Sequence, residues 1–124
     1  MLTKAGIERG LANFYGTEAY HSLGPLFPGL KMTDGPAWLA ENADCVWLMV
    51  AIASHQPECR KDGMLRDFQL WTLKVAPDKS AVLKCERDTN DPKPIIQKLD
   101  WTDFPLDEIK LYVENGVLFL PSER

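Results

Sequence analysis

Histidine and cysteine are scarce in this chain of 124 residues, which has two histidines and three cysteines. Cys45, Cys59 and Cys85 are odd in number and widely spaced, so they do not predict the disulfide framework of a small secreted domain. Together with His21 and His55 they show no short ligand spacing of the kind found in zinc sites. We therefore expect no metal ion, no cofactor and a reducing, cytoplasmic environment.

The chain also lacks an excess of basic residues and a long apolar run. Its net charge of −4 argues against general affinity for nucleic acid, because phosphate binding needs clustered lysine and arginine. Lys4, Glu8 and Arg9 interrupt the N-terminus, and no signal-peptide core follows. The longest apolar run, Cys45 to Ala53, is far shorter than the ~20 residues of a membrane span. The length suits one domain over residues 1–124, with no membrane contact.

That apolar run is the stretch around which the rest of the chain is predicted to fold. We interpret about Cys45–Ser54 as a helix, because Asp44 can serve as its N-cap and Pro57 follows its end. The leucine, methionine and alanine residues within it also favour a helix. A helix that is apolar on all sides must be covered on all sides. The sequence therefore predicts a central helix that is almost completely buried.

The flanking segments predict two helices before the central one and a run of strands after it. The two helices are expected over Thr3–Phe14 and Pro36–Ala43, and a polar connection over Gln56–Asp67. A period of two residues predicts strands over Phe68–Val75, Ala81–Arg87, Ile95–Trp101, Ile109–Val113 and Val117–Leu120. Asn115-Gly116 should form a two-residue hairpin turn that sets Ile109, Leu111 and Val113 against Val117 and Phe119.

This order of elements predicts an α+β fold. The N-terminal helices and the buried central helix, about Cys45–Ser54, should pack on one face of a C-terminal antiparallel sheet of four to five strands. The other face of the sheet should contact solvent through its charged side chains, namely Lys74, Lys84, Glu86, Lys98 and Asp100.

Several short phrases together carry a resemblance to a known family. They are Gly16-Thr17-Glu18-Ala19-Tyr20, Thr33-Asp34-Gly35 with Leu39-Ala40-Glu41, Trp47-Leu48 with Ala51-Ile52-Ala53, Phe68-Gln69 with Trp71 and Leu73, and Thr102-Asp103-Phe104-Pro105-Leu106 running to Leu120-Pro121-Ser122-Glu123. Over nearly its whole length the chain resembles a family of small bacterial, plasmid and phage proteins catalogued as a domain of unknown function. The resemblance implies an accessory or mobile-element gene and carries over no activity, cofactor or catalytic residue.

Cys45 is the one candidate for a catalytic residue. A thiol at the N-terminus of a helix has a lowered pKa, and papain-like peptidases combine such a helix with an antiparallel sheet. That chemistry needs a histidine in contact with the sulfur. His55 lies ten residues along the same helix, about 15 Å away, and His21 could approach only from the N-terminal segment. The competing interpretation of Cys45 is a small buried apolar residue.

Three further groups of residues have both a functional and a structural interpretation. Thr33-Asp34 and Thr102-Asp103 could supply paired carboxylates, or simply turn and cap hydrogen bonds. Four tryptophans could line a ligand cleft, although most are expected in the core: Trp38, Trp47, Trp71 and Trp101. The basic residues could form one positive face or a solvated surface diluted by acids: Arg60, Lys61, Arg66, Lys84, Lys93 and Lys98.

These observations together favour a non-enzymatic protein-interaction module from an accessory or mobile genetic element, with another protein as its partner. Inhibition of a host or phage-defence factor would be one such role. The alternative is a cysteine-hydrolase-like enzyme that uses Cys45, and a weaker alternative is a protein associated with nucleic acid.

Overall fold

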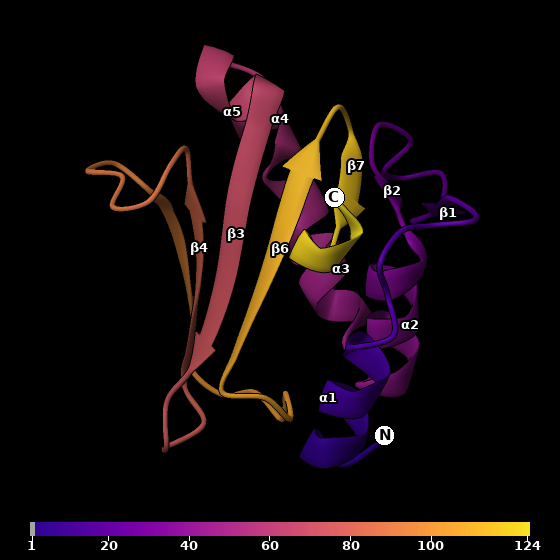
Figure 1. Cartoon of the computed structure of the whole chain (residues 1–124). Helices are drawn as coiled ribbons and strands as arrows, with labels where there is room; N and C mark the ends of the chain where they lie inside the picture. Colours follow the sequence, from indigo (N-terminus) through magenta and orange to yellow (C-terminus); the bar gives the residue numbers. More distant parts are fainter. Residues whose placement is uncertain (1) are drawn as a thin grey trace.

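The computed structural model describes residues 2–124, in which helices precede most of the strands (Figure 1). The helices are α1 (Lys4–Leu11), α2 (Asp34–Asn42), α3 (Val46–Ser54), α4 (Gln56–Cys59), α5 (Gly63–Asp67) and the short 3-10 helix η1 (Pro121–Glu123). The strands are β1 (His21–Ser22), β2 (Lys31–Met32), β3 (Phe68–Val75), β4 (Ala81–Glu86), β5 (Ile95–Leu99), β6 (Glu108–Glu114) and β7 (Val117–Phe119).

The strands form one sheet in the order β1-β2-β7-β6-β3-β4-β5, so the α+β class is confirmed. The sheet has seven strands instead of four to five, and the pairing of β2 with β7 is parallel, which makes the sheet mixed. The additional strands β1 and β2 have two residues each and lie in a segment rich in glycine and proline. Two residues are too few to show a period of two, so sequence reasoning missed both strands.

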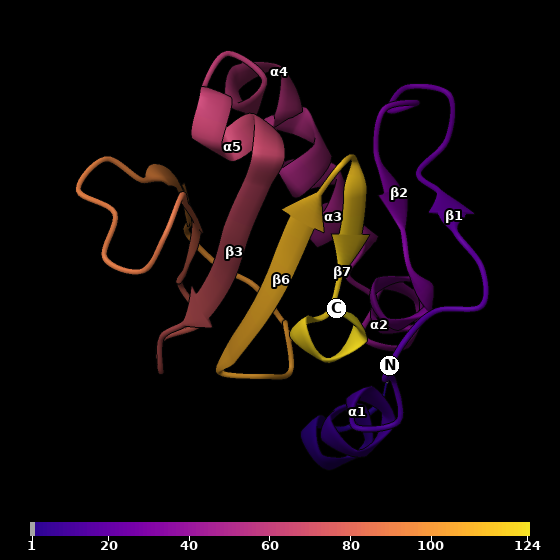
Figure 2. The ribbon, with the colours of Figure 1, turned by 45° about the horizontal axis from the view of Figure 1, so that its top comes forward.

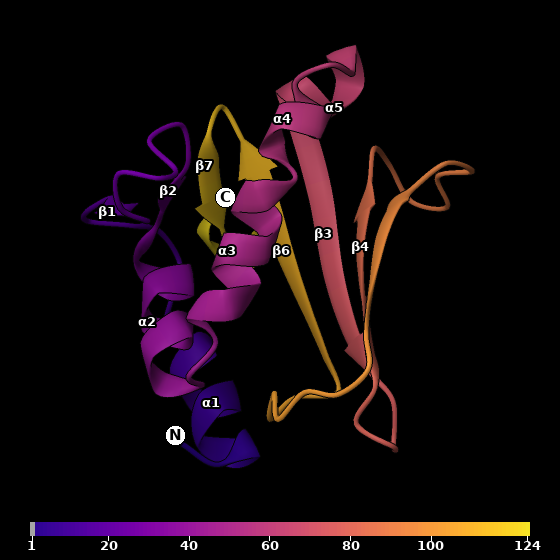
Figure 3. The same cartoon turned by 180° about the vertical axis from the view of Figure 1, so that it is seen from behind.

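The helices α2, α3 and α4 cover one face of the sheet, as the views from the two sides show (Figure 1, Figure 3). The short helix η1 lies on the other face (Figure 1), where the Arg124 guanidinium stacks over the ring of Phe68, and the rest of that face is called the open face below. In Figure 2 the helices α2, α3 and α4 lie behind the strands β3, β6 and β7. Alternate side chains of the strands point toward the helices and form the core with α3: Trp71, Leu73, Leu83, Leu111, Leu118, Leu48, Met49 and Ile52. None of the helices in residues 2–124 has the length and apolar character needed to cross a membrane.

The outward side of α3 contradicts the prediction that this helix is almost completely buried. The helix begins at Val46, and Asp44 does not cap it because its φ of 51° places it in the left-handed region. Leu48, Met49, Ile52 and Ala53 are buried, whereas Val46 is 54% exposed. The physical reason is the two-layer architecture, in which a helix has the sheet on one side only.

Two local predictions also need correction. The segment Gln56–Asp67 is not a simple connection, because it contains α4 and α5, each too short to show a helical period. In the β6–β7 hairpin, Asn115 and Gly116 both have positive φ, as predicted, but Val113 pairs with Leu118. Leu118 therefore points inward, and Val117 and Phe119 point to the other face.

On the open face, Lys74, Lys98 and Asp100 are exposed as predicted, but Glu86 is only 8% exposed. Its carboxylate accepts a hydrogen bond from the Asp91 backbone N–H at 3.1 Å and lies 3.5 Å from Lys84 Nζ. The β4–β5 loop folds back over this side chain, which sequence periodicity could not reveal.

Candidate functional site

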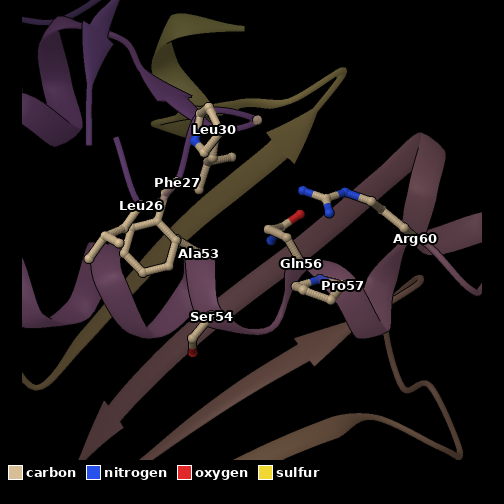
Figure 4. Close-up of a pocket in the computed structure, with 10 residues that line it drawn as sticks. Leu26, Phe27, Leu30, Ala53, Ser54, Gln56, Pro57 and Arg60 are labelled. Carbon is tan, nitrogen blue, oxygen red and sulfur yellow. The ribbon is translucent and has the colours of Figure 1, made fainter. Parts of the chain in front are cut away.

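A groove of about 250 Å³ opens between the loop before β2 and the junction of α3 with α4 (Figure 4). Most of its lining is apolar and comes from Leu26, Phe27, Pro28, Leu30, Ala53 and Pro57. Three polar side chains also line it: Ser54, Gln56 and Arg60. Leu26 stands at the rim and is 84% exposed. Sequence reasoning expected only a loop here and did not find the groove.

The loop is held over α3 by its own turns and by the β6–β7 hairpin. Gly24 has a φ of 98°, and its carbonyl accepts a hydrogen bond from the Phe27 N–H at 3.2 Å. The Leu30 N–H then donates to the Phe27 carbonyl at 3.4 Å, and the Lys31 N–H donates to Gly116 at 2.9 Å. These bonds give the apolar wall of the groove a defined position.

The floor of the groove is a closed network of amide hydrogen bonds around the buried Gln56. Its Nε2 donates to the Ile52 carbonyl at 3.0 Å and to Gln69 Oε1 at 2.9 Å. Gln69 Nε2 donates back to Gln56 Oε1 at 2.9 Å, and Trp71 Nε1 donates to Gln69 Oε1 at 2.8 Å. Both N–H donors of the Gln56 amide form hydrogen bonds within the protein. The floor can therefore contact a ligand by its shape, but Gln56 has no free N–H group to donate to it.

Arg60 is the one charged side chain that lines the groove. Its guanidinium forms no hydrogen bond or ion pair within residues 2–124. Arg60 Nη2 lies 3.0 Å from the position that a Cβ atom of Gly29 would occupy, so the side chain extends over Gly29. Figure 4 shows it pointing from the end of α4 toward Gln56. A guanidinium in this position can bind a carboxylate through two parallel hydrogen bonds.

The outer face of α3 leads into the groove. Val46, Val50 and Ser54 follow one another at intervals of four residues, which places them on one side of the helix. Trp47 and Ala51 flank them and are partly exposed. Because Ser54 also lines the groove, these five residues, here called the α3 face, join the groove in one mostly apolar surface.

Cys45 lies in the core, with an exposed fraction of 0%, and its Sγ donates to the Leu39 carbonyl at 3.5 Å. Burial, together with the charges of Asp44 and Asp103, raises the pKa of this thiol to about 12. The desolvation of the thiolate therefore outweighs any effect of the nearby helix N-terminus. The buried position of Cys45 agrees with the competing interpretation of this residue as a small buried apolar side chain.

Neither histidine is engaged with Cys45. His21 Nε2 is hydrogen-bonded to Asp34 Oδ1 at 2.8 Å, and His55 Nε2 to Gln97 Oε1 at 2.8 Å. The geometry thus supplies Cys45 with no hydrogen-bonded imidazole in the described residues. A nucleophilic thiol needs such a base.

Cys59 and Cys85 are brought together in the core, although they are far apart in sequence. The interaction between the two thiols lowers the pKa of Cys59 and raises that of Cys85. All three cysteines are free. Within residues 2–124, no group of three or more histidine, cysteine, aspartate or glutamate side chains is placed to hold a metal ion.

Thr33, Asp34 and Thr102 of the two Thr-Asp phrases form hydrogen bonds within the fold. Thr33 Oγ1 donates to Glu123 Oε1 at 2.8 Å, and Thr102 Oγ1 accepts a hydrogen bond from the Phe104 N–H at 3.2 Å. The Glu18 N–H, and secondly His21, lower the pKa of Asp34 by donating to its carboxylate. The Thr102 bond is the turn bond of the structural interpretation. Thr33, in contrast, makes no side-chain cap bond to α2, and the contacts of Thr33 and Asp34 join segments far apart in sequence.

The tryptophans are distributed between core and surface. Trp71 is buried, Trp38 and Trp47 are partly buried against the core, and Trp101 is 64% exposed. Of the four, Trp47 is the one on the α3 face.

The basic residues do not form one face. Arg60, Lys61 and Arg66 lie on or beside α4 and α5, whereas Lys84 and Lys98 point from the uncovered side of the sheet. Lys93 lines a hollow together with Lys61, so it belongs with the first group.

The comparisons with known proteins identify a family but no function. The profile of a family described as "Family of unknown function (DUF6876)" matches residues 5–124. The chain belongs to this family. Comparison with curated proteins and with solved structures gave no match. The resemblance seen in the sequence to a family of unknown function is therefore confirmed.

In this DUF6876 member, three of the phrases that carried the resemblance meet at the N-terminus of α2. The Asp34 N–H donates to Thr17 Oγ1 at 3.0 Å. The carboxylate of Glu123 accepts hydrogen bonds from Thr33 Oγ1, the Gly35 N–H and the Leu120 N–H. A Cβ atom on Gly35 would overlap Glu123 and Leu120. These hydrogen bonds join the C-terminal segment to α2. The residues that form them hold the fold together and do not line the groove.

Proposed function

We propose that this DUF6876 protein is a non-enzymatic protein-interaction module and that it binds its partner through the α3 face and the adjoining groove. The observation that carries the proposal is the apolar outward side of α3. The helix reads VWLMVAIAS and contains no charged residue, yet Val46 remains 54% exposed. A helix that is apolar on all sides is normally buried on all sides, and here a partner would supply the missing cover.

The rest of the proposal concerns the biological setting. The three free cysteines favour a reducing, cytoplasmic location. The resemblance carried by the short phrases of the sequence favours an accessory or mobile genetic element. Inhibition of a host or phage-defence factor is the role that we propose. A hydrolase that uses Cys45 is less favoured because that thiol is buried. A nucleic-acid role is less favoured because the net charge of the chain is −4.

The experiment compares protein capture by the wild type with capture by Val46→Asp. Aspartate in the first turn of a helix is compatible with the helix dipole, so the substitution places a charge on the α3 face without opposing the helix. The tagged proteins are incubated with a lysate of the source cells, and the retained proteins are quantified by mass spectrometry. We expect one or a few proteins retained by the wild type to be lost with Val46→Asp.

Met64→Asp is the matched control. Met64 is 60% exposed and lies in the first turn of another helix, α5, outside the α3 face. This variant should retain the same proteins as the wild type. If no protein distinguishes Val46→Asp from the control, while both variants melt at the wild-type temperature, the proposed function is wrong.

A further inference from the structure

The size of the groove restricts what can occupy it. Its volume of about 250 Å³ is below the ~300–1,000 Å³ of typical sites for small-molecule ligands and cofactors. It is large enough for one bulky apolar side chain, and such side chains commonly anchor a protein partner in a pocket. The continuous α3 face extends the contact beyond that anchor. A peptide segment of a partner protein therefore fits this surface better than a free metabolite.

The two ends of the groove have different chemistry. Phe27, Ala53 and Pro57 provide apolar contacts, whereas Arg60 provides a guanidinium without a partner in the described residues. A guanidinium beside an apolar pocket favours a ligand that combines an apolar group with an anion.

The acidic groups nearest in sequence to Arg60 are engaged elsewhere. Glu58 Oε2 lies 3.7 Å from His55 Nδ1, and Asp62 Oδ2 lies 2.7 Å from Arg87 Nη2. Lys61, the next residue, is exposed and does not line the groove. Arg60 is thus the cation at the groove although the whole chain is negative, and its guanidinium complements an anionic ligand.

We propose that the partner presents a peptide segment with a bulky apolar side chain and a nearby carboxylate. The apolar side chain occupies the groove between Phe27 and Pro57, and the carboxylate is bound by the Arg60 guanidinium. The inference rests on the proposed function and names the chemical class of the partner.

The α3 face sets the length of the segment. From Val46 to Ser54 the helix rises about 12 Å, which an extended peptide spans with about four residues. The anchor, the carboxylate and these four residues together make a segment of roughly six residues, which a heptapeptide can present.

The test begins with selection from a random heptapeptide library displayed on phage, with the full-length protein as bait. We expect enrichment of peptides in which Asp or Glu stands within about three residues of Leu, Ile, Met or Phe. The best peptide is then synthesised with its carboxylate intact and with Asp→Asn or Glu→Gln. Its binding is measured by fluorescence anisotropy with the wild type, Arg60→Gln and the matched control Lys61→Gln.

The wild type and Lys61→Gln should prefer the acidic peptide by about tenfold, the scale of one charge-assisted contact. Arg60→Gln should bind both peptides with equal affinity, because the removed guanidinium and carboxylate interact with each other. Enrichment without acidic residues, no enrichment above an empty bait, or an unchanged acidic preference in Arg60→Gln would each overturn the inference. N-acetyl-leucine, if it displaces the peptide at micromolar concentration, would instead assign the groove to a small acid and also overturn it.

The same variants separate this inference from the proposed function. If Val46→Asp loses the captured protein and Arg60→Gln keeps it, with no acidic preference among the peptides, the module binds a partner of different chemistry. If Val46→Asp keeps every captured protein, the proposed function itself has failed. Arg60 is exposed at the end of a short helix, so its substitution should leave the melting temperature unchanged.

Discussion

At the scale of single residues, two glycines of the same helix have different neighbours in the structure, and the sequence around them does not show this difference. Gly6 and Gly10 both lie in α1, and helix propensity alone predicts that each weakens the helix. A Cβ atom on Gly6 would make ordinary contacts of 3.4 Å with Thr3 Oγ1, whereas one on Gly10 would overlap the indole of Trp38 on α2. Position 10 therefore requires glycine because α1 packs closely on α2, and position 6 does not.

Substituting each of these glycines by alanine should therefore change stability in opposite directions. Gly6→Ala should raise the free energy of unfolding by about 0.5–1 kcal/mol through helix propensity. Gly10→Ala should lower it by about 1–2 kcal/mol, because overpacking against Trp38 exceeds the same gain in propensity. Urea denaturation followed by circular dichroism measures both. Equal changes in the two variants would contradict the close packing of α1 on α2.

At the scale of elements, the turn of the last hairpin was predicted correctly, whereas the inward face of its second strand, β7, was not. Asn115-Gly116 was recognised because both residues tolerate positive φ, and the structure has φ values of 54° and 74° there. The inward side chain of β7 was assigned wrongly, because a two-residue turn at Asn115-Gly116 pairs Glu114 with Val117 and Val113 with Leu118, and therefore places Leu118 on the inward face of Val113. The turn also packs on Gly29, whose carbonyl oxygen lies 2.8 Å from the position of a Cβ atom on Gly116.

Gly116→Val should destabilise the protein by about 2–4 kcal/mol, through a β-branched residue at positive φ and through the clash with Gly29. The melting temperature measures the loss. Asn115→Gly is the control at the adjacent turn position and should change stability by less than about 0.5 kcal/mol, because glycine adopts positive φ freely. A melting temperature of Gly116→Val that matches the control would mean that the hairpin does not form as described.

At the scale of the whole molecule, contacts between distant segments join elements that have no sequence relationship. Arg87 after β4 donates to Asp62 Oδ2 before α5 at 2.7 Å and to Asp91 Oδ2 in the β4–β5 loop at 2.8 Å. The backbone N–H groups of Arg87 and Lys93, followed by the Arg87 guanidinium, lower the pKa of Asp91 to about 2. Arg87, followed by the backbone N–H groups of the α5 cap, also lowers the pKa of Asp62.

This network predicts how acid changes stability. Because the pKa of Asp91 is lower in the folded state than its ordinary 3.8, its ionised form stabilises the fold above that pH and the contribution is lost as pH falls toward about 2. Asp91→Asn should therefore be less stable than the wild type at pH 7, and the difference should shrink across this range. Thermal unfolding from pH 7 to pH 2 measures it. The exposed Asp100→Asn should match the wild type throughout, and a difference for Asp91→Asn that does not vary with pH would contradict the network.

The sequence by itself determined the α+β class, the strands β3 to β7 within about two residues, the hairpin turn and the family, because these depend on local periodicity and turn chemistry. Only the tertiary structure decided the parallel pairing of β2 with β7, the contact of Cys59 with Cys85, and the groove that places Arg60 beside Phe27. It also decided that α3 keeps one apolar side open, which the apolar run alone predicted to be buried. The reason is that periodicity reports which side chains avoid water, whereas the partners that cover them come from segments far away in the chain.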